Sequence, residues 1–254
     1  MNWDAFINAL TPVYGASESA AIARILKQEN IEPDSAIERL LRAEPLQYIL
    51  GKTWFYKHEF LIASGALIPR PETEELVDYI MKSKHPIKKG IDIGTGSGCI
   101  GISLALAYPN CSFTATDLSP QALNIAQKNA HALSCKNITF LAHDFLNEAF
   151  PGNDYSLIVS NPPYITPKEA ESMEKNVMDY EPHMALFTPE DDVLIFYKRL
   201  AKFLAHQASS CVLYAEINAA LGQETLDLFS DFPHRNLLKD MSGKDRFIAI
   251  KKEG

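Results

Sequence analysis

The first 50 residues carry a helical pattern of hydrophobic positions. Small and apolar side chains recur three and four residues apart from Ala20 to Leu26, as on the buried face of an α-helix. A second helix is predicted over residues 36–41, with Asp34 as its N-cap. Because strand-forming residues are few in this segment, we expect it to fold as a small helical domain.

The pattern changes to that of β-strands after Gly51. Two strand-forming runs, 52–56 and 59–62, flank a short polar break and predict a β-hairpin over residues 52–63. We expect an N-terminal helical domain with its hairpin linker over residues 1–68 and a second domain over residues 69–254.

Residues 69–254 alternate apolar, strand-like runs with amphipathic, helix-like ones. Pro71 followed by Glu72 and Glu74 favours a helix start, because proline is pre-set for the first turn and acids face the positive helix end. Strands are predicted at 90–93, 112–116, 138–141, 157–160 and 211–217, and helices at 99–107, 120–132, 193–205 and 219–229. The expected fold class is α/β, a mostly parallel sheet covered on both faces, which binds ligands beyond the carboxyl ends of its strands.

The composition is that of an ordinary globular protein. Hydrophobic residues make up 46% of the 254 residues and charged residues 22%, which disfavours disorder and fibrous repeats. The net charge of -8 gives no global attraction for a phosphate backbone, so no direct nucleic-acid binding is expected. The first residues do not resemble a signal peptide, and no apolar run reaches bilayer length. We therefore expect a cytoplasmic protein without a membrane partner and, since no heptads occur, a monomer.

The cysteines give no sign of a disulfide framework or a metal site. Cys99, Cys111, Cys135 and Cys211 stand singly, without a second cysteine or a histidine at metal-ligand spacing. We expect reduced thiols that fill core space, and no metal.

A glycine-rich turn joins the predicted strand at 90–93 to the helix at 99–107. Residues 94–98 read Gly-Thr-Gly-Ser-Gly, and glycine lets a backbone approach a ligand closely. Asp117, at the end of the next strand, lies 19 positions after Gly98, where a doubly wound fold places the carboxylate that binds a ribose hydroxyl. A nucleoside ligand is therefore a better interpretation than a turn without a ligand.

Two kinds of nucleoside ligand fit this turn. Residues 96–101 match the dinucleotide fingerprint G-x-G-x-x-G, whereas Asp92 with the three glycines that follow is typical of the S-adenosylmethionine loop of Rossmann-like methyltransferases. Asp144 and Phe145 would suit an adenine, through a carboxylate acceptor and an aromatic face. The alternative is that Asp144 caps the next helix and Phe145 lies in the core.

A second candidate motif, Asn161-Pro162-Pro163-Tyr164, follows the predicted strand at 157–160. Neither proline has an N–H, so the turn offers carbonyl acceptors and suits a substrate that brings donors. Asn161 Oδ1 and the Pro162 carbonyl could accept the two hydrogens of an NH₂ group and aim its lone pair at an electrophilic methyl. The ring of Tyr164 could pack against the planar group of the substrate. We favour this interpretation over a plain Asn-Pro turn, and we assign no general base.

The chain resembles the HemK/PrmC family of protein-(glutamine-N5) methyltransferases, which modify peptide chain release factors. The resemblance spans nearly the whole chain and depends on blocks at 44–51 (EPLQYILG), 68–74 (IPRPETE), 92–98 (DIGTGSG), 161–164 (NPPY), 180–182 with 185–186, and 242–246 (SGKDR). The block at 161–164 is shared with adenine-amino methyltransferases, whereas the first two blocks are far more specific.

The resemblance implies a Rossmann-like, seven-stranded, S-adenosylmethionine-dependent methyltransferase sheet and an N-terminal helical domain that helps dock the release factor. The cofactor would be S-adenosyl-L-methionine, converted to S-adenosyl-L-homocysteine, and the acceptor a glutamine amide in the Gly-Gly-Gln motif of class 1 release factors. The turn analysis and the resemblance together assign cofactor binding to Gly94, Thr95, Gly96, Ser97, Gly98, Asp117, Asp144, Phe145 and Asn161. The residues expected to hold the glutamine are Asn161, Pro162, Pro163 and Tyr164, with Asn161, Pro162 and Tyr164 as the catalytic group.

The leading hypothesis is therefore methyl transfer from S-adenosylmethionine to N5 of a protein glutamine. An adenine N6-methyltransferase acting on nucleic acid is disfavoured by the net charge and the helical N-terminal segment. An NAD-dependent oxidoreductase gives no account of residues 161–164. A purely structural binding module would leave both loops without a purpose.

Overall fold

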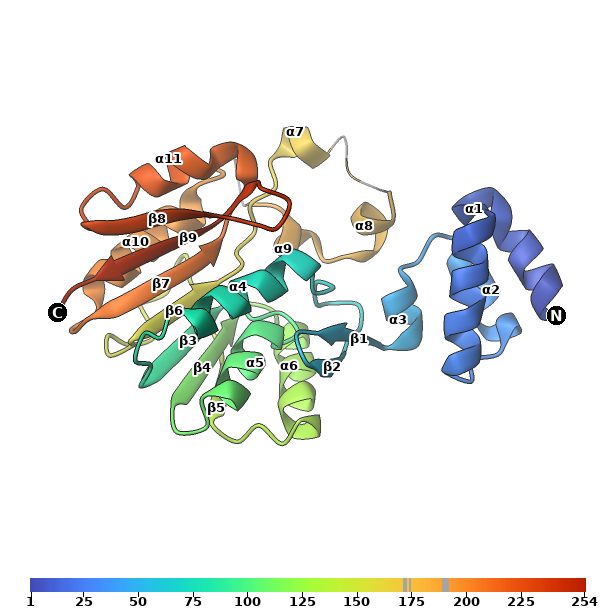
Figure 1. Ribbon diagram of the computed structural model, residues 1–254, viewed down its shortest axis with the longest axis horizontal. Helices are drawn as coiled ribbons and strands as arrows, with labels where there is room; N and C mark the ends of the chain where they lie inside the picture. Colours follow the sequence, from blue (N-terminus) through green and yellow to red (C-terminus); the bar gives the residue numbers. More distant parts are fainter. Residues whose placement is uncertain (171–172, 174, 189–191) are drawn as a thin grey trace.

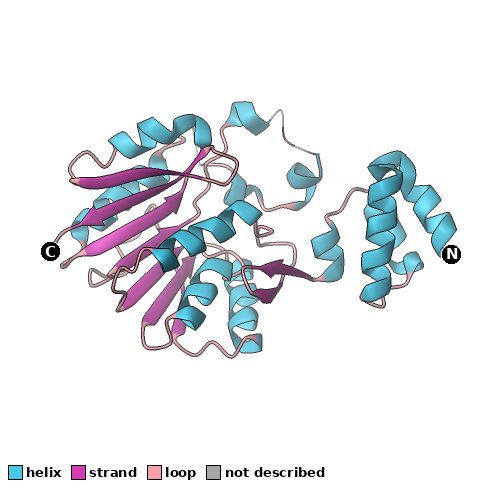
Figure 2. Cartoon of the chain, viewed as in Figure 1, coloured by secondary structure: helices cyan, strands magenta, loops and turns pink. Residues whose placement is uncertain are grey.

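The computed structural model describes residues 1–170, 173, 175–188 and 192–254. Within this described part, a seven-stranded sheet has the strand order β5-β4-β3-β6-β7-β9-β8 (Figure 1). The N-terminal helices lie beyond one end of the sheet-containing part, and a short two-stranded hairpin lies between the two (Figure 2). The fold is the α/β fold that the pattern predicts.

The parallel strands of the sheet occur close to their predicted positions. They are β3 (Lys89–Ile93), β4 (Ser112–Asp117), β5 (Ile138–Ala142), β6 (Leu157–Ser160) and β7 (Cys211–Glu216). The chain runs outward from β3 to β4 and β5 and then returns to place β6 on the other side of β3. This reversal makes a topological switch point between β3 and β6, and such folds bind ligands at the carboxyl ends of the strands there.

Two strands at the C-terminal end of the chain have no counterpart in the predicted pattern. Strand β9 (Asp245–Lys252) pairs antiparallel with both β7 and β8 (His234–Lys239). Most of β8 is exposed or half-buried because it lies at the edge of the sheet. Its sequence therefore lacks the apolar run by which the central strands were recognised.

Helices cover both faces of the sheet, so the central strands β3, β6 and β7 are buried on both sides. On β6, Leu157 and Val159 belong to one core cluster and Ile158 belongs to the other. The first cluster includes residues of α4 (Pro71–Lys82) and α5 (Cys99–Ala107), and the second includes residues of α10 (Ile195–His206). The remaining helices of this part are α6 (Pro120–Ala132), α7 (Pro167–Ala170), α8 (Lys175–Tyr180), α9 (His183–Leu186), the 3₁₀ turn η1 (Ala219–Leu221) and α11 (Gly222–Asp227).

The N-terminal segment is helical, as predicted, and has an apolar cluster of its own. Its helices are α1 (Trp3–Gln28), α2 (Pro33–Leu41) and α3 (Leu46–Leu50). Phe6, Leu10 and Leu26 are fully buried between them. The predicted N-cap at Asp34 is wrong, because Pro33 already begins α2 and the Asp34 carboxylate instead pairs with the terminal amino group. Proline at the first helical position needs no hydrogen-bond partner for its nitrogen, which explains the earlier start.

The predicted hairpin is formed by β1 (Lys52–Phe55) and β2 (His58–Leu61). Phe55 and Phe60 are buried in the same cluster as residues of α4 and α5. Toward the helical segment, Lys52 forms an ion pair with Glu29 at 2.8 Å. The hairpin thus packs on the sheet-containing part of the chain while it contacts the N-terminal helices.

The cysteines lie in or beside the core. Cys99, Cys135 and Cys211 are buried free thiols, and Cys111 is a half-buried one. None of the helices in the described ranges is long and apolar enough to cross a bilayer.

Candidate functional site

A cavity of about 530 Å³ opens at the carboxyl edge of the parallel strands. Its walls include Gly94 and Gly96 from the turn after β3, Asp117 at the end of β4, and Asn161 and Pro162 after β6. Cavities of this size are typical of small-molecule sites. The fold therefore brings together two predicted motifs that lie more than 60 residues apart in the sequence.

The glycine-rich turn is held in shape by the protein itself. The buried Asp92 carboxylate accepts hydrogen bonds from Thr95 Oγ1 at 2.6 Å and from the Gly101 N–H at 2.9 Å. The N–H groups of Gly94 and Thr95 both donate to the Thr116 carbonyl at 2.9 Å. Burial raises the pKa of Asp92 to about 6, although its hydrogen bonds oppose this rise.

The five residues of the turn divide into two groups. Gly94 and Gly96 line the cavity, with φ of +73° and +56° and open space where a Cβ would stand. Thr95, Ser97 and Gly98 do not line it: they are buried and support the turn from behind. These three residues can affect ligand binding through the shape that they give to the turn.

Asn129 on α6 supports the turn and was not singled out in the sequence. Its side-chain nitrogen donates to the Ser97 carbonyl at 2.8 Å and to the Leu61 carbonyl of β2 at 2.9 Å. Its oxygen accepts the Leu61 N–H at 2.6 Å. A single buried amide thereby ties the hairpin to the glycine-rich turn, and no local pattern marks such a long-range contact.

Asp117 lies in the cavity wall, as expected of a ribose-binding carboxylate. Its Oδ2 accepts the Gly96 N–H at 2.8 Å, and its Oδ1 accepts the Ser119 N–H at 2.9 Å. Burial raises the pKa of this carboxyl group above its ordinary value. Each carboxylate oxygen has a further lone pair for a ligand hydroxyl.

Asp144 and Phe145 also line the cavity, although both have structural partners as well. The Asp144 carboxylate accepts the N–H groups of Leu146 and Asn147 at 3.1 Å, and the Asn147 side-chain hydrogen bond is the main cause of its lowered pKa. The buried ring of Phe145 packs edge-on against Phe203 with centroids 5.7 Å apart. The alternative interpretation is wrong about a helix after Asp144, because residues 145–147 form only a turn, whose N–H groups the carboxylate accepts. Phe145 has the core contacts of that alternative, and both residues still line the cavity.

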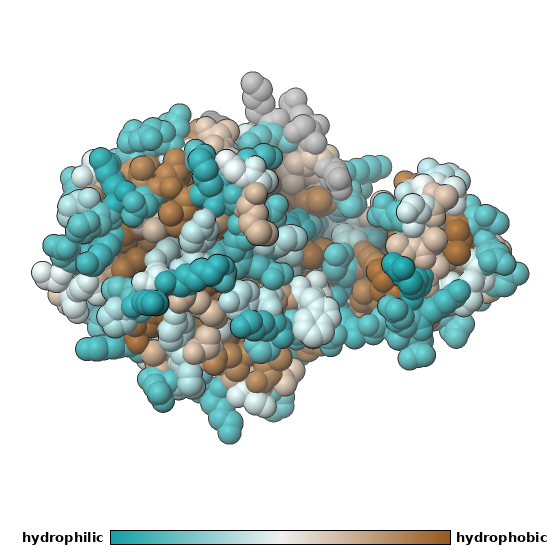
Figure 3. Space-filling model, in the orientation of Figure 1, coloured by the Kyte–Doolittle hydropathy of each residue, from teal (hydrophilic) through white to brown (hydrophobic). Residues whose placement is uncertain are grey.

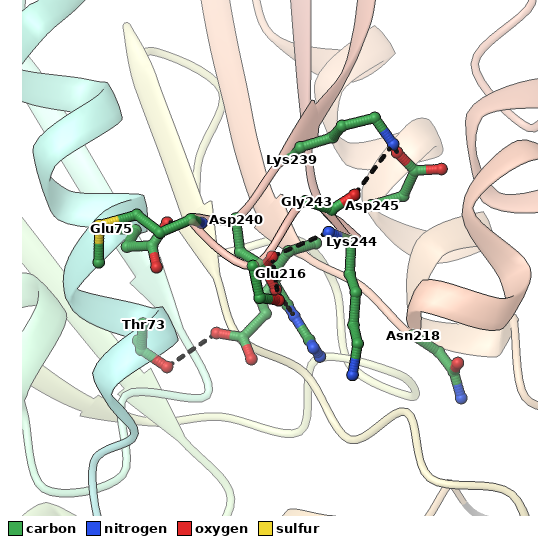
Figure 4. Close-up of polar contacts among 12 residues, drawn as sticks. Thr73, Glu75, Glu216, Asn218, Lys239, Asp240, Gly243, Lys244 and Asp245 are labelled. Atoms are coloured by element: carbon green, nitrogen blue, oxygen red, sulfur yellow. Dashed lines mark hydrogen bonds and ion pairs between the residues drawn. The ribbon is translucent and has the colours of Figure 1, made fainter.

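Asn161 is oriented by a chain of hydrogen bonds from other elements. Its Nδ2 donates to Thr73 Oγ1 at 3.2 Å, and the Thr73 hydroxyl donates to Glu216 Oε2 at 2.8 Å. Figure 4 shows Thr73 in the first turn of α4 pointing toward Glu216, which ends β7. Pro162 and Pro163 line the cavity beside Asn161.

Tyr164 follows these residues but is not part of the cavity lining. Its hydroxyl donates to Glu216 Oε1 at 2.8 Å. Burial is the largest cause that raises its pKa, and the negative charge of Glu216 adds to the effect. The hydroxyl therefore stays protonated and serves as a donor to the buried carboxylate.

Thr73 and Glu216 were not recognised as site residues from the sequence. Thr73 lies in the block 68–74 on which the family resemblance depends, but no pattern gives its partner 143 positions away. Glu216 had one usable signal, because an acidic residue at the end of a wholly apolar strand is buried at the ligand-binding edge of the sheet.

The residues of the cavity fit S-adenosylmethionine. Gly94 and Gly96 have open space where a Cβ would stand, so a ligand can approach the backbone of the turn closely. The Asp117 carboxylate can accept ribose hydroxyls, and Phe145 provides an apolar face. Across the described ranges, no group of three or more His, Cys, Asp and Glu side chains is arranged to hold a metal ion.

Comparisons of the sequence with known proteins agree with this geometry. The model of the methyltransferase small domain family matches residues 72–180. A release factor glutamine methyltransferase of Flavobacterium psychrophilum is 43% identical over 236 residues, which cover 89% of this chain and 82% of that protein. One of Bacteroides thetaiotaomicron is 43% identical over 232 residues, with the same coverage.

Comparisons of the structure reach more distant methyltransferases. The hMettl16 catalytic domain, solved with an RNA hairpin, matches with a TM-score of 0.56 and 19% identity over 76% of this chain and 74% of that chain. An M. jannaschii tRNA m1G37 methyltransferase matches with a TM-score of 0.51 and 13% identity over 79% of this chain and 55% of that chain. At such identities the likeness establishes the methyltransferase fold alone.

Proposed function

The chain belongs to the family of release factor glutamine methyltransferases, and from this premise we propose that it methylates the side-chain amide nitrogen of the glutamine in the Gly-Gly-Gln motif of class 1 peptide chain release factors. The methyl donor is S-adenosyl-L-methionine, and the donor product is S-adenosyl-L-homocysteine. The observation that carries the proposal is the position of Asn161 and Pro162 in the wall of the cavity that the glycine-rich turn and Asp117 also line.

The cofactor site consists of residues with distinct contributions. Gly94 and Gly96 give close backbone approach, Asp117 accepts from the ribose, and Phe145 with Asp144 borders the adenine. Thr95, Ser97 and Gly98 keep the turn in its binding shape. When bound, S-adenosylmethionine supplies an electrophilic methyl group on a sulfonium.

Asn161 and Pro162 orient the acceptor amide. An amide nitrogen is a weak nucleophile because its lone pair is delocalised into the carbonyl group. Two acceptors, Asn161 Oδ1 and the Pro162 carbonyl, hold its two hydrogens and leave the lone pair free to point toward the methyl group. With the methyl group supplied by S-adenosylmethionine, the oriented amide nitrogen would accept it and would release one proton to solvent.

Pro163 lines the acceptor side of the site, and Tyr164 supports it from behind. Pro163 lacks an N–H and so adds no competing donor beside the glutamine. Tyr164 lies outside the cavity lining, and its hydroxyl donates to Glu216, so it contributes to the acceptor side by holding this carboxylate and not by contact with the amide.

The N-terminal helices are suited to docking the protein substrate. Figure 3 shows hydrophobic residues gathered where these helices face the rest of the chain. On that side, the Tyr180 hydroxyl of α8 donates to the Arg42 carbonyl after α2 at 3.0 Å, which links the helical segment to the catalytic part. We assign docking to residues 1–68 and catalysis to residues 69–254.

The two alternative activities are not favoured by the comparisons. An adenine methyltransferase would share the Asn-Pro-Pro-Tyr turn, but the relatives that match along most of the chain are named for a protein substrate. A dinucleotide-dependent oxidoreductase gives no role to Asn161.

A transfer assay with labelled S-adenosylmethionine tests the proposal. Purified class 1 release factor, a variant with Gly-Gly-Ala in place of Gly-Gly-Gln, and duplex DNA and total RNA are offered separately. Label in the unaltered release factor alone is the expected result. Label in a nucleic acid, or equal label in the Gly-Gly-Ala variant, would contradict it.

A further inference from the structure

Three elements that are far apart in the sequence meet behind Asn161. Thr73 in the first turn of α4 points toward Glu216 at the end of β7 (Figure 4). Asn161 follows β6. Thr73 and Glu216 are 2% and 1% exposed, so neither can exchange its partners for water. In the mechanism above, neither residue contacts the cofactor or the acceptor.

The chemistry of the three groups fixes the direction of their hydrogen bonds. A hydroxyl has a single hydrogen, and the Thr73 hydroxyl gives it to the Glu216 carboxylate at 2.8 Å. Its oxygen can then only accept, and it accepts from Asn161 Nδ2 at 3.2 Å. The amide nitrogen is thereby committed to Thr73, and Asn161 Oδ1 is the atom left for a ligand.

The second carboxylate oxygen of Glu216 is also used as an acceptor. It takes the Tyr164 hydroxyl hydrogen at 2.8 Å, so hydroxyl donors face both oxygens. Two donors suit an ionised carboxylate, since a carboxyl hydrogen on either oxygen would oppose one of them. Burial raises the pKa of Glu216, while these hydrogen bonds and the nearby Arg246 guanidinium oppose the rise.

Arg246 is itself held in place from the turn between β8 and β9. Its Nε donates to the Asp240 carboxylate at 3.1 Å. The same carboxylate accepts the Lys244 N–H at 2.9 Å, and Figure 4 shows this turn next to Glu216. The block 242–246 thus supports the charge of Glu216 from outside the cavity.

We propose that Glu216, acting through Thr73, is a positioning residue that keeps the Asn161 amide turned with its oxygen toward the acceptor glutamine. This inference rests on the proposed function, because it matters only where Asn161 must accept a hydrogen bond from an NH₂ group.

Loss of this hydrogen-bond relay, from Glu216 through Thr73 to Asn161, would reverse the orientation of the Asn161 amide. Without a carboxylate acceptor, the Thr73 hydrogen is free to point at Asn161, and the amide can rotate to accept it with Oδ1. Asn161 then presents its own NH₂ group to the NH₂ group of the glutamine. Two donors repel each other, whereas the shape of the site hardly changes because the two ends of an amide are nearly equal in size.

The Thr73→Val and Thr73→Ser variants test the relay. Valine keeps the shape and removes the hydroxyl, whereas serine keeps the hydroxyl. We expect Thr73→Val to lower kcat for release factor methylation by about 10- to 100-fold, and Thr73→Ser to stay within about threefold of the unaltered protein. The matched control is Thr225→Val, since Thr225 is an equally buried threonine on α11. It should leave kcat unchanged.

Two further readouts separate positioning from simple destabilisation. In Thr73→Val, the Kd of S-adenosylhomocysteine, measured by calorimetry, and the melting temperature should barely change. Glu216→Gln should likewise lower kcat while these two quantities barely change. An unchanged kcat in Thr73→Val would overturn the proposed relay. Equal losses of kcat in the valine and serine variants would overturn it too, as would a loss of kcat that parallels a loss of cofactor affinity or a lower melting temperature. Absence of methylation by the unaltered protein would instead refute the proposed function.

Discussion

Replacing Asp117 by asparagine should weaken cofactor binding while it leaves the fold intact. In the free protein, the carboxylate accepts the N–H groups of Gly96 and Ser119, one on each oxygen. Asparagine offers one oxygen and an NH₂ group, so it can serve only one of these donors. It also replaces the charged acceptor that we assign to the ribose with a neutral amide, which has one acceptor oxygen and one donor nitrogen.

The magnitude follows from the acceptors that are lost. A hydrogen bond to a charged group contributes about 1.5–3 kcal/mol, which corresponds to an increase of about 10- to 150-fold in the Kd of S-adenosylhomocysteine. The free energy of unfolding should change less, by about 1 kcal/mol, because losing one turn hydrogen bond is offset by removing a buried charge whose pKa is raised by burial.

Titration calorimetry with S-adenosylhomocysteine measures this effect, and Asp154→Asn is a suitable control. Asp154 is also an acid near the end of a strand, since it precedes β6, but it is 62% exposed and pairs with Lys89 away from the cavity. Since a raised pKa means that Asp117 takes up a proton earlier on acidification, affinity should fall toward acid pH in the unaltered protein and less so in the variant. A Kd within about twofold of the unaltered protein in Asp117→Asn would remove this carboxylate from the binding site.

Further predictions concern the turn and the acceptor side. The raised pKa of Asp92, about 6 against an ordinary 3.8, gives a stabilisation that is complete below pH 4 and lost as the pH rises through 6. As the pH is lowered from 7 to 4.5, the free energy of unfolding measured in urea should rise by about 2 kcal/mol more in the unaltered protein than in Asp92→Asn. A difference between the two proteins that does not depend on pH would refute this. Gly98→Ala should lower the unfolding free energy by about 1–3 kcal/mol, because the new Cβ at φ +85° would lie 2.7 Å from Ile102 Cδ1 and 3.0 Å from Ala126 Cβ; unchanged thermal unfolding would speak against this packing. Asn161→Ala should lower kcat by about 10²- to 10³-fold, and intact turnover would show that the amide has no role in transfer.

The sequence pattern predicts the central part of this fold well for a physical reason. Strands buried on both faces are continuous apolar runs, and β6 and β7 stand out from their surroundings in this way. Edge strand β8 and the short helices α8 and α9 are mostly exposed or half-buried, and so they leave no such pattern. Strand β8 and the antiparallel pairing of β9 therefore had to come from the structure.

The residues of the site also divide into those that the sequence could predict and those that it could not. Glycines 94 and 96, Asp117 and Asn161 lie next to strand ends, so local spacing and sheet topology together bring them to one cavity. The relay from Glu216 through Thr73 depends on contacts 143 and 88 positions apart, between elements whose mutual packing no local pattern encodes. Local motifs therefore indicate where the cavity lies, but not which residues of each motif line it or which groups orient them.

Methylation of the Gly-Gly-Gln motif itself tests the central claim most directly. A purified class 1 release factor is incubated with this protein and S-adenosylmethionine, and the peptide spanning the motif is fragmented by tandem mass spectrometry. The account predicts a single added methyl group on the side chain of the glutamine. An unmodified peptide, despite cofactor binding shown by calorimetry, or a methyl group on another residue would contradict it.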